Sequence, residues 1–146
     1  MRVPCVAAGY YHLEKSALTS DGYLDTGDIA TIDPLGYVQI VDRAKDIVKS
    51  GGKWISSLEI ENAATLFPGV GLAAVIGIPD PKWDERALLL VTSSTGGGID
   101  LDDFRDHLAG KLPKWWLPDE IRIVDSLPLG ATGKIDKEVL RAQLLG

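Results

Sequence analysis

Two apolar runs, residues 72–79 and 86–94, constrain the fold of this chain most strongly. Both are rich in branched aliphatic side chains, which favour β structure, and each has the length of a strand. A run that is apolar at nearly every position is typical of a buried strand, because no alternate position is left for solvent. The sequence therefore predicts a sheet with a buried centre.

Segments with helical periodicity alternate with these strands. The first begins at a serine N-cap, Ser56 or Ser57, and two others span residues 101–112 and 137–145. One more strand is expected at residues 121–124. From residue 43 onward the order is strand, helix, strand, strand, helix, strand, helix, which predicts a small α+β domain: a three-stranded sheet covered by helices.

The preceding residues predict a β-hairpin. Residues 28–32 and 37–41 have strand character, and the turn between them contains a proline and a glycine. So short a segment cannot form a hydrophobic core of its own. We therefore expect residues 1–42 to be the end of a larger N-terminal domain, and residues 43–146 to be a complete C-terminal domain.

Composition limits the possible partners and location. The chain has 146 residues, one cysteine and a formal net charge of −6 at pH 7. This charge argues against a general nucleic-acid or anionic-membrane surface, and no apolar run is long enough to cross a membrane. Cys5 has no partner for an internal disulfide, and no apolar signal segment follows Arg2. We expect a cytoplasmic protein without a transmembrane segment or a nucleic-acid partner.

Several common catalytic constellations are missing from the sequence. His12 and His107 are its only histidines, and neither has a second ligand at metal-binding spacing, so no metal site is expected on this chain. There is no G-x-S-x-G nucleophile motif and no Walker-type loop. The glycines at 96–98 precede acidic residues, which repel phosphate, so we interpret them as a connector.

Positive charge is concentrated in one place despite the acidic total. Arg43, Lys45, Lys49 and Lys53 lie within eleven residues. From composition alone, a solvated strand edge and an anion-binding surface are equally good interpretations of this basic cluster.

A single lysine near the C-terminus has a suggestive setting. Lys134 follows a Thr-Gly turn and leads directly into the last predicted helix. A projecting ammonium stabilises negative charge that builds up on a phosphate or carboxylate during displacement. Taken alone, a turn lysine is more often an ordinary surface residue, so its interpretation depends on other motifs.

Three separated motifs resemble the adenylate-forming superfamily of acyl-CoA synthetases, adenylation domains and luciferases. They are Thr26-Gly27-Asp28, the run from 42 to 57, and Gly133-Lys134. The run from 42 to 57, together with Lys114-Trp115-Trp116-Leu117-Pro118-Asp119, looks most like medium- to long-chain fatty-acyl-CoA synthetases.

The resemblance implies a two-step reaction. A large N-terminal domain binds ATP, Mg²⁺ and a carboxylic acid, and a mobile C-terminal domain alternates between two poses. The first pose makes acyl-adenylate and pyrophosphate, and the second allows the thiol of CoA to form the thioester and release AMP. The phosphate loop, the acyl pocket and the Mg²⁺ ligand of that large domain have no counterpart in this sequence, so the chain alone is expected to be inactive.

The resemblance also implies roles for individual residues. Asp28 matches the aspartate that binds the ribose hydroxyls of ATP, and Arg43 matches an arginine that reaches the nucleotide. Without the resemblance, a surface ion pair with Asp42 or Asp46 would be the better interpretation of Arg43. Lys134 matches the adenylation lysine.

Lys45 falls at the hinge position, and the remaining matches concern CoA. Gly51 and Gly52 match the segment beside the pantetheine tunnel, where a Cβ would narrow the channel, although a plain β-turn also explains them. Lys49 and Lys53 are expected near the CoA phosphates. Trp54 replaces an arginine that is frequent in short-chain relatives, which favours the fatty-acyl subgroup.

Two other functions stay open. The chain could belong to an adenylation module that loads a carrier protein in place of CoA, or it could be a free-standing domain that binds a partner without catalysis. The identity of the acyl group and the oligomeric state are not encoded in these motifs.

Overall fold

The computed structural model describes residues 18–145, so Arg2, Cys5 and His12 lie outside the described residues. Two compact units are present, and the division between them falls between Lys45 and Asp46. It lies three residues after the domain boundary that the sequence predicted.

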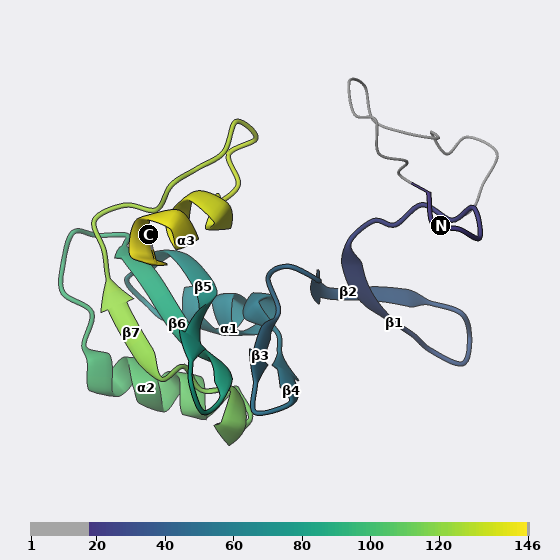
Figure 1. The fold of residues 1–146 in the computed structure, drawn as a ribbon. Helices are drawn as coiled ribbons and strands as arrows, with labels where there is room; N and C mark the ends of the chain where they lie inside the picture. The colour runs from purple at the N-terminus through teal and green to yellow at the C-terminus, as the bar shows by residue number, and fades with distance from the viewer. Residues whose placement is uncertain (1–17, 146) are drawn as a thin grey trace. The chain divides into compact units, whose positions relative to one another are not determined.

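The first unit contains the predicted hairpin. Strand β1 (Asp28–Ile32) pairs antiparallel with β2 (Val38–Arg43), as Figure 1 shows. The carboxylate of Asp33 holds the turn by accepting hydrogen bonds of 2.9 Å from the amides of Leu35 and Tyr37. The second strand begins and ends slightly later than the sequence predicted.

One face of this hairpin is apolar and open to solvent. Ile32 is paired with Val38, and Ala30 with Ile40, so these four side chains share a face. The three larger ones are exposed. The hairpin therefore has the apolar surface of a core strand pair without a core of its own.

The second unit is built on a five-stranded sheet. The long strands β5 (Val70–Asp80) and β6 (Asp84–Ser93) form an antiparallel pair, and β7 (Glu120–Ile123) runs parallel to β6. The short hairpin of β3 (Val48–Ser50) and β4 (Lys53–Ile55) joins the sheet through β6. The α+β class is confirmed, but the sheet has five strands where the sequence predicted three.

The predicted order has one strand before the first helix, where the structure has the two short strands β3 and β4. Each has only three residues, and of these six only Val48 and Ile55, at the outer ends of the hairpin, are buried. Such a segment has no apolar run to mark it, and its pairing depends on the turn.

Three helices pack on the sheet. They are α1 (Ser57–Thr65), α2 (Leu101–Ala109) and α3 (Lys137–Leu145), and the short 3₁₀ turn η1 (Lys114–Trp116) precedes β7. Ser56 is the N-cap of α1, because its hydroxyl accepts a hydrogen bond of 3.2 Å from the amide of Glu59. Helix α2 ends before the predicted residue 112, and α3 has the predicted bounds.

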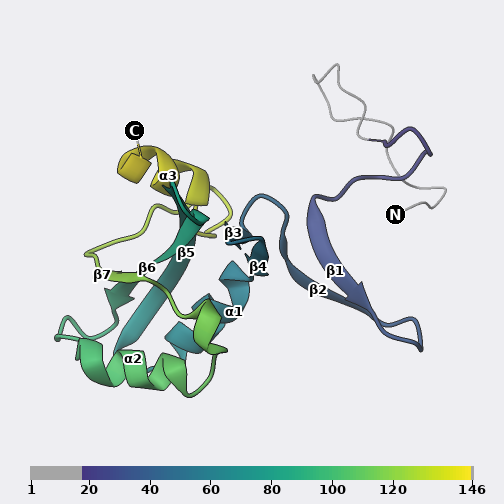
Figure 2. The same cartoon turned by 60° about the horizontal axis from the view of Figure 1, so that its bottom comes forward.

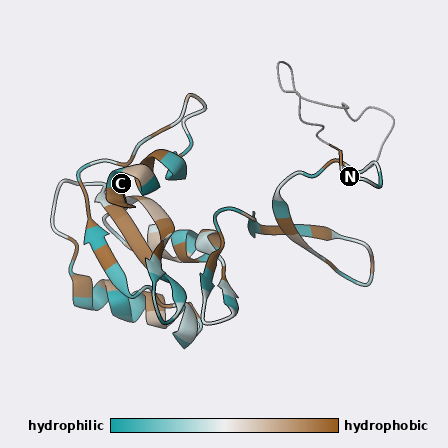
Figure 3. Ribbon diagram, viewed as in Figure 1, coloured by the Kyte–Doolittle hydropathy of each residue, from teal (hydrophilic) through white to brown (hydrophobic). Residues whose placement is uncertain are grey.

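The core has two layers, one on each face of the β5–β6 pair. Val75 and Leu89 face α1 and α2, whereas Ile76 and Leu88 face α3. Figure 2 shows α3 on one side of the strands and α1 and α2 on the other. Figure 3 shows the apolar residues concentrated on these strands. Both predicted runs are therefore buried strands, covered on both faces.

Candidate functional site

In the first unit, Asp28 and Arg43 lie directly opposite each other. They are Cα partners across the β1–β2 pair, and Arg43 Nε is 3.2 Å from Asp28 Oδ1. Gly27, at φ 67°, accepts a hydrogen bond of 2.8 Å from the amide of Ala44 and thereby fixes the strand ends. The hairpin thus presents a carboxylate beside an exposed guanidinium, a pair able to bind hydroxyl and phosphate oxygens.

The ion-pair partner of Arg43 differs from both candidates that the sequence suggested. Asp42 is buried and accepts a hydrogen bond of 2.7 Å from the backbone amide of Arg43. Asp46 instead contacts Arg141 in the second unit. The Arg43 guanidinium instead forms an ion pair with Asp28.

Lys45 is the last residue of the first unit. It is exposed and lies in the turn at residues 44–46, where β2 has ended and β3 has not begun. A change in backbone dihedrals in this turn would disturb no strand or helix.

Lys134 lies on a narrow loop that is closed at its base. Leu129 and Ile135 form a β-bridge, and the amide of Gly130 donates a hydrogen bond of 2.8 Å to the carbonyl of Lys134. Gly133, at φ 75°, makes the turn. Lys134 is exposed, and Figure 1 shows the loop projecting away from the sheet just before α3.

The predicted glycine turn is confirmed between β3 and β4. Gly51 and Gly52 have φ values of 56° and 75°, and Ser50 pairs with Lys53, which makes a two-residue hairpin loop. The amide of Gly51 donates a hydrogen bond of 2.8 Å to the carbonyl of Trp83. A Cβ on Gly51 would lie 2.8 Å from Trp83 Cε3, whereas one on Gly52 would meet open space. Local packing alone therefore requires glycine at position 51.

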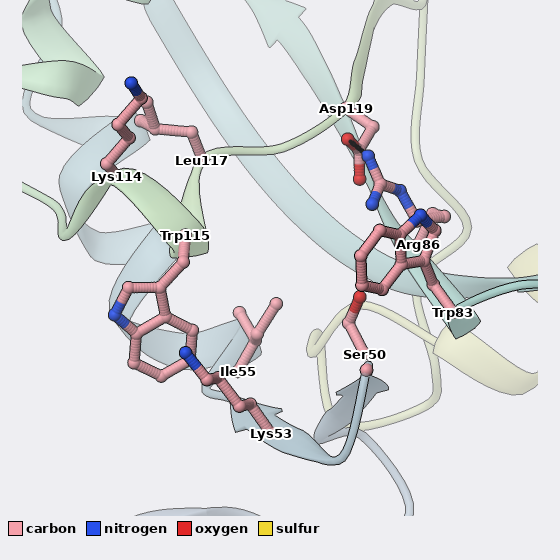
Figure 4. Close-up of a pocket in the computed structure, with 10 residues that line it drawn as sticks. Ser50, Lys53, Ile55, Trp83, Arg86, Lys114, Trp115, Leu117 and Asp119 are labelled. Atoms are coloured by element: carbon pink, nitrogen blue, oxygen red, sulfur yellow. Dashed lines mark hydrogen bonds and ion pairs between the residues drawn. The ribbon is translucent and has the colours of Figure 1, made fainter.

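A pocket of about 270 Å³ opens beside this turn (Figure 4). Two tryptophans border it: Trp83 from the β5–β6 turn and Trp115 from η1. Lys53 Nζ lies 4.9 Å from the centre of the Trp115 ring, within cation–π range. The lining residues are Ser50, Gly51, Lys53, Ile55, Trp83, Arg86, Lys114, Trp115, Leu117 and Asp119.

An ion pair forms part of the wall. Arg86 pairs with Asp119, and its guanidinium carbon lies 5.5 Å from the centre of the Trp83 ring (Figure 4). Asp80 holds Trp83 by accepting backbone hydrogen bonds of 2.9 Å from Lys82 and 2.8 Å from Trp83. The hydrogen bond from Lys82 contributes most, and that from Trp83 next, to a pKa of Asp80 that is below its usual 3.8.

The pocket brings together only part of the predicted CoA set. Gly51 and Lys53 line it. Lys49 pairs with Trp54 on the opposite face of the hairpin, because side chains alternate along a strand. Gly52 is at the turn but is not among the lining residues.

Sequence reasoning missed the aromatic and cationic side chains that the β5–β6 turn and η1 contribute. Trp83 and Arg86 are more than thirty positions from the glycines, as is Lys114. The segment from Lys114 to Asp119 was a signal of family, but nothing in its spacing indicated that it faces the glycine turn.

The two predicted centres of the second unit are far apart. Figure 1 shows the loop of residues 129–135 at one end of the unit and the β3–β4 hairpin at the other.

No metal centre is apparent in the described part of the chain. Among residues 18–145, no group of three or more His, Cys, Asp or Glu side chains could hold a metal ion. Within the same range, no helix is both long and apolar enough to cross a membrane.

Comparison with known proteins agrees with this geometry. Residues 59–134 match the family described as AMP-binding enzyme C-terminal domain. The structure of ATP-bound MatB from Rhodopseudomonas palustris superimposes with a TM-score of 0.77 at 37% identity, over 86% of this chain and 25% of that one. The fold is that of the C-terminal part of adenylate-forming enzymes. The chain belongs to the AMP-binding enzyme C-terminal domain family.

Curated relatives are CoA ligases. A 3-methylmercaptopropionyl-CoA ligase of Ruegeria lacuscaerulensis is 49% identical over 136 residues, which are 93% of this chain and 25% of the relative. A long-chain-fatty-acid–CoA ligase of Thermus thermophilus is 45% identical over 148 aligned positions, which cover 98% of this chain and 27% of the relative. The chain thus spans about a quarter of the length of the curated relatives it matches, and the resemblance seen in its motifs is confirmed.

Proposed function

We propose that this chain is the mobile C-terminal part of an ATP-dependent, AMP-forming acyl-CoA ligase that acts on a fatty or related carboxylic acid. The observation that carries the proposal is the family match of a unit with Lys134 at one end and a pocket beside Gly51 at the other. Its partner is an N-terminal domain of the same protein, which holds ATP, the acid and Mg²⁺. Residues 1–42 are the end of that domain and residues 43–146 the mobile one.

In the adenylating pose, Lys134 faces the reacting groups. A carboxylate oxygen of the acid attacks the α-phosphorus of ATP, and the bond to pyrophosphate breaks. The ammonium of Lys134 stabilises the negative charge that shifts between carboxylate and phosphate. Asp28 accepts hydrogen bonds from the ribose hydroxyls, and Arg43 binds an oxygen of the same nucleotide. The ion pair between these two side chains supports a shared ligand.

In the thioester-forming pose, the pocket beside Gly51 receives CoA. The thiol sulfur attacks the acyl carbonyl carbon, and AMP leaves. The pocket is smaller than the roughly 300 Å³ at which complete ligand pockets begin, so it suits one end of a long ligand. Trp83 and Trp115 offer faces for stacking the adenine ring, and Lys53 and Lys114 offer charge for the phosphates.

Lys45 is the hinge between the two poses. Its support is its place in an exposed turn at the division of the two units. A hinge must absorb large changes in φ and ψ, and a solvated polar turn does so without disturbing packing.

The names of the most similar relatives listed favour a fatty or related acid. Those named for 3-methylmercaptopropionyl, medium-chain and long-chain acyl groups are 43–49% identical, whereas those named for feruloyl, acetate and cinnamate are 37–39% identical. This difference supports a fatty or related acid in the proposed reaction.

The two half-reactions test the proposal in the longer protein. Lys134→Ala should lower acid-dependent pyrophosphate release about 100- to 1,000-fold, because a charge-stabilising donor is lost, and should spare thioester formation from supplied acyl-adenylate. Trp115→Ala should do the reverse and raise the KM for CoA about 5- to 100-fold, because base stacking is lost. Lys111→Ala, at another exposed lysine, is the control. Equal loss of both half-reactions in Lys134→Ala would show that the two-pose assignment is wrong.

The same assay separates the other two functions. Transfer to a phosphopantetheinylated carrier protein but not to free CoA would indicate an adenylation module for carrier loading. Absence of acid-dependent AMP formation, together with tight ATP-independent binding to another protein, would indicate a partner-binding domain.

A further inference from the structure

Helix α3 follows the Lys134 loop directly, and an ion pair fixes its first residue. Lys137 Nζ lies 2.7 Å from Glu61 Oε1 of α1 and donates a hydrogen bond of 2.8 Å to Ser57 Oγ. The side chains of Lys137 and Glu61 are only 13% and 16% exposed. The same Glu61 oxygen accepts a hydrogen bond of 2.7 Å from the amide of Val75 in β5. The start of α3 is therefore tied to both a helix and the sheet.

A second ion pair lies one turn further along α3. Arg141 is four residues after Lys137, so both side chains point from the same face of the helix. Arg141 Nη2 is 2.9 Å from Asp46 Oδ1, and these side chains are 24% and 14% exposed. Asp46 is the first residue of the second unit and follows Lys45 directly. Helix α3 is thus connected to the residue at which its unit begins.

The Lys134 loop is connected to this helix at its base. The loop is closed by its own backbone, and the amide of Asp136 donates a hydrogen bond of 2.8 Å to the carbonyl of Pro128 just below it. Asp136 also caps α3 by accepting bonds of 3.1 Å from the amides of Glu138 and Val139. Asp136 therefore connects the base of the loop to the start of α3.

Apolar packing and ion pairing contribute differently to the docking of α3: packing supplies affinity, and ion pairing selects an orientation. Leu140 is buried in the core layer between α3 and the sheet, and its burial supplies the apolar contribution to docking. Apolar contact is non-directional, whereas an ion pair with a hydrogen-bonded partner has one geometry. Partly buried ion pairs often contribute little net stability compared with apolar replacements, so their value lies in the orientation they select.

We propose that Lys137 and Arg141 are positioning residues for adenylation: they fix α3, and through it the Lys134 loop, relative to the start of the unit at Asp46. This inference rests on the proposed function of Lys134. A displacement of about 1 Å in a group that meets the transition state can cost on the order of 100-fold in rate. The residues themselves do not touch the reacting atoms.

The test uses variants that remove each ion pair. Lys137→Met combined with Glu61→Gln removes one pair and keeps an acceptor for the Val75 amide. Arg141→Met removes the other pair, and Arg141→Lys is its conservative counterpart. Arg105→Met, at an exposed position on α2, is the matched control for the loss of a cation.

Adenylation and thioester formation are measured in the longer protein. The double variant and Arg141→Met should each lower kcat for acid-dependent pyrophosphate release about 10- to 100-fold, with KM for ATP nearly unchanged. Thioester formation from supplied acyl-adenylate should stay within about twofold. Arg141→Lys should restore most of the loss, and Arg105→Met should have no effect.

Two kinetic results would overturn the inference. One is a parallel fall of both half-reactions together with the thermal midpoint, which is the pattern of a merely structural role. The other is unchanged adenylation in both variants. If the unmodified protein releases no acid-dependent pyrophosphate, the proposed function itself is wrong.

A measurement that does not depend on activity distinguishes failure of the positioning inference from failure of the proposed function. In the 146-residue chain, the amide resonances of Gly133 and Lys134 should shift or broaden in the double variant and stay unchanged in Arg105→Met. Unchanged resonances in the double variant would contradict the positioning role, whatever the reaction.

Discussion

At the scale of single residues, Gly51 has two separate reasons to be glycine. Its φ of 56° is costly for other residues, and the space for a Cβ is taken by the Trp83 ring. Gly52, with a φ of 75°, has only the first reason. The pair offers a matched comparison between backbone strain and steric conflict.

We expect Gly52→Ala to lower the free energy of unfolding by about 1 to 2 kcal/mol, the usual cost of the left-handed region. Gly51→Ala should cost about 1 to 3 kcal/mol more, because Trp83 must move to make room. Urea denaturation of both variants measures the two costs, and the indole N–H resonance of Trp83 should shift only in Gly51→Ala. Equal costs would show that the Trp83 ring moves aside freely.

The sequence located the loop residues of the candidate site better than its aromatic walls. Lys134 and the two glycines stand in turns whose composition marks them. Trp83 and Trp115 are placed beside Gly51 by the antiparallel β5–β6 pair and by η1, which are contacts between distant segments. No local pattern encodes such contacts. For the same reason, the sequence did not separate Lys53, which lines the pocket, from Lys49 on the other face.

At the scale of elements, the turn between β5 and β6 is ordered by a carboxylate. Asp80 accepts hydrogen bonds from the amides of Lys82 and Trp83, and Asp84 ends the turn with a φ of 73°. The ionised form of Asp80 is the better acceptor, so the lowered pKa and the order of the turn have the same origin.

This turn should make stability depend on pH in a defined direction. Because the pKa of Asp80 is lower in the folded state, its contribution is fully present above the ordinary value of 3.8 and is lost as the pH falls through the folded-state value. The urea midpoints of the parent chain and Asp80→Ala should therefore differ at neutral pH and converge below pH 3.8. Asp106→Ala, on the exposed side of α2, reports the effect of removing one charge. A gap that persists in acid would contradict this account.

Element boundaries followed the sequence where burial is continuous. The predicted run at 72–79 lies inside β5, and all of the run at 86–94 except residue 94 lies inside β6. Apolar side chains on both faces of these strands leave no other interpretation of the two runs. Helix α2 was predicted too long because Leu112 is buried and keeps the helical period beyond Gly110. The amide of Leu112 still donates to the carbonyl of Leu108. Periodicity reports burial, not the last regular turn.

At the scale of the whole molecule, the division after Lys45 predicts where the chain can be cut. Every buried hydrophobic residue of the described range lies between Ile47 and Leu140, so the second unit contains the whole of this core. Arg43 and Lys45 are exposed trypsin sites at the division. Cleavage there removes no core contact.

Limited trypsin digestion should therefore leave a stable fragment that begins at Ala44 or Asp46 and keeps a cooperative thermal transition. Mass spectrometry identifies its first residue. A chain carrying Arg43→Gln and Lys45→Gln is the control, and should lose the cut without losing the core. Rapid digestion to small peptides with no intermediate would contradict an independently folded second unit.

The separation of the Lys134 loop from the β3–β4 hairpin has a kinetic consequence. In the proposed enzyme, both ends must visit one reaction centre in turn, so every catalytic cycle includes a large rotation of a body of about one hundred residues. The solvent must flow around that body as it turns. Turnover in such an enzyme would be limited by friction as well as by bond making, and thickening the medium would slow it even though every chemical barrier is unchanged.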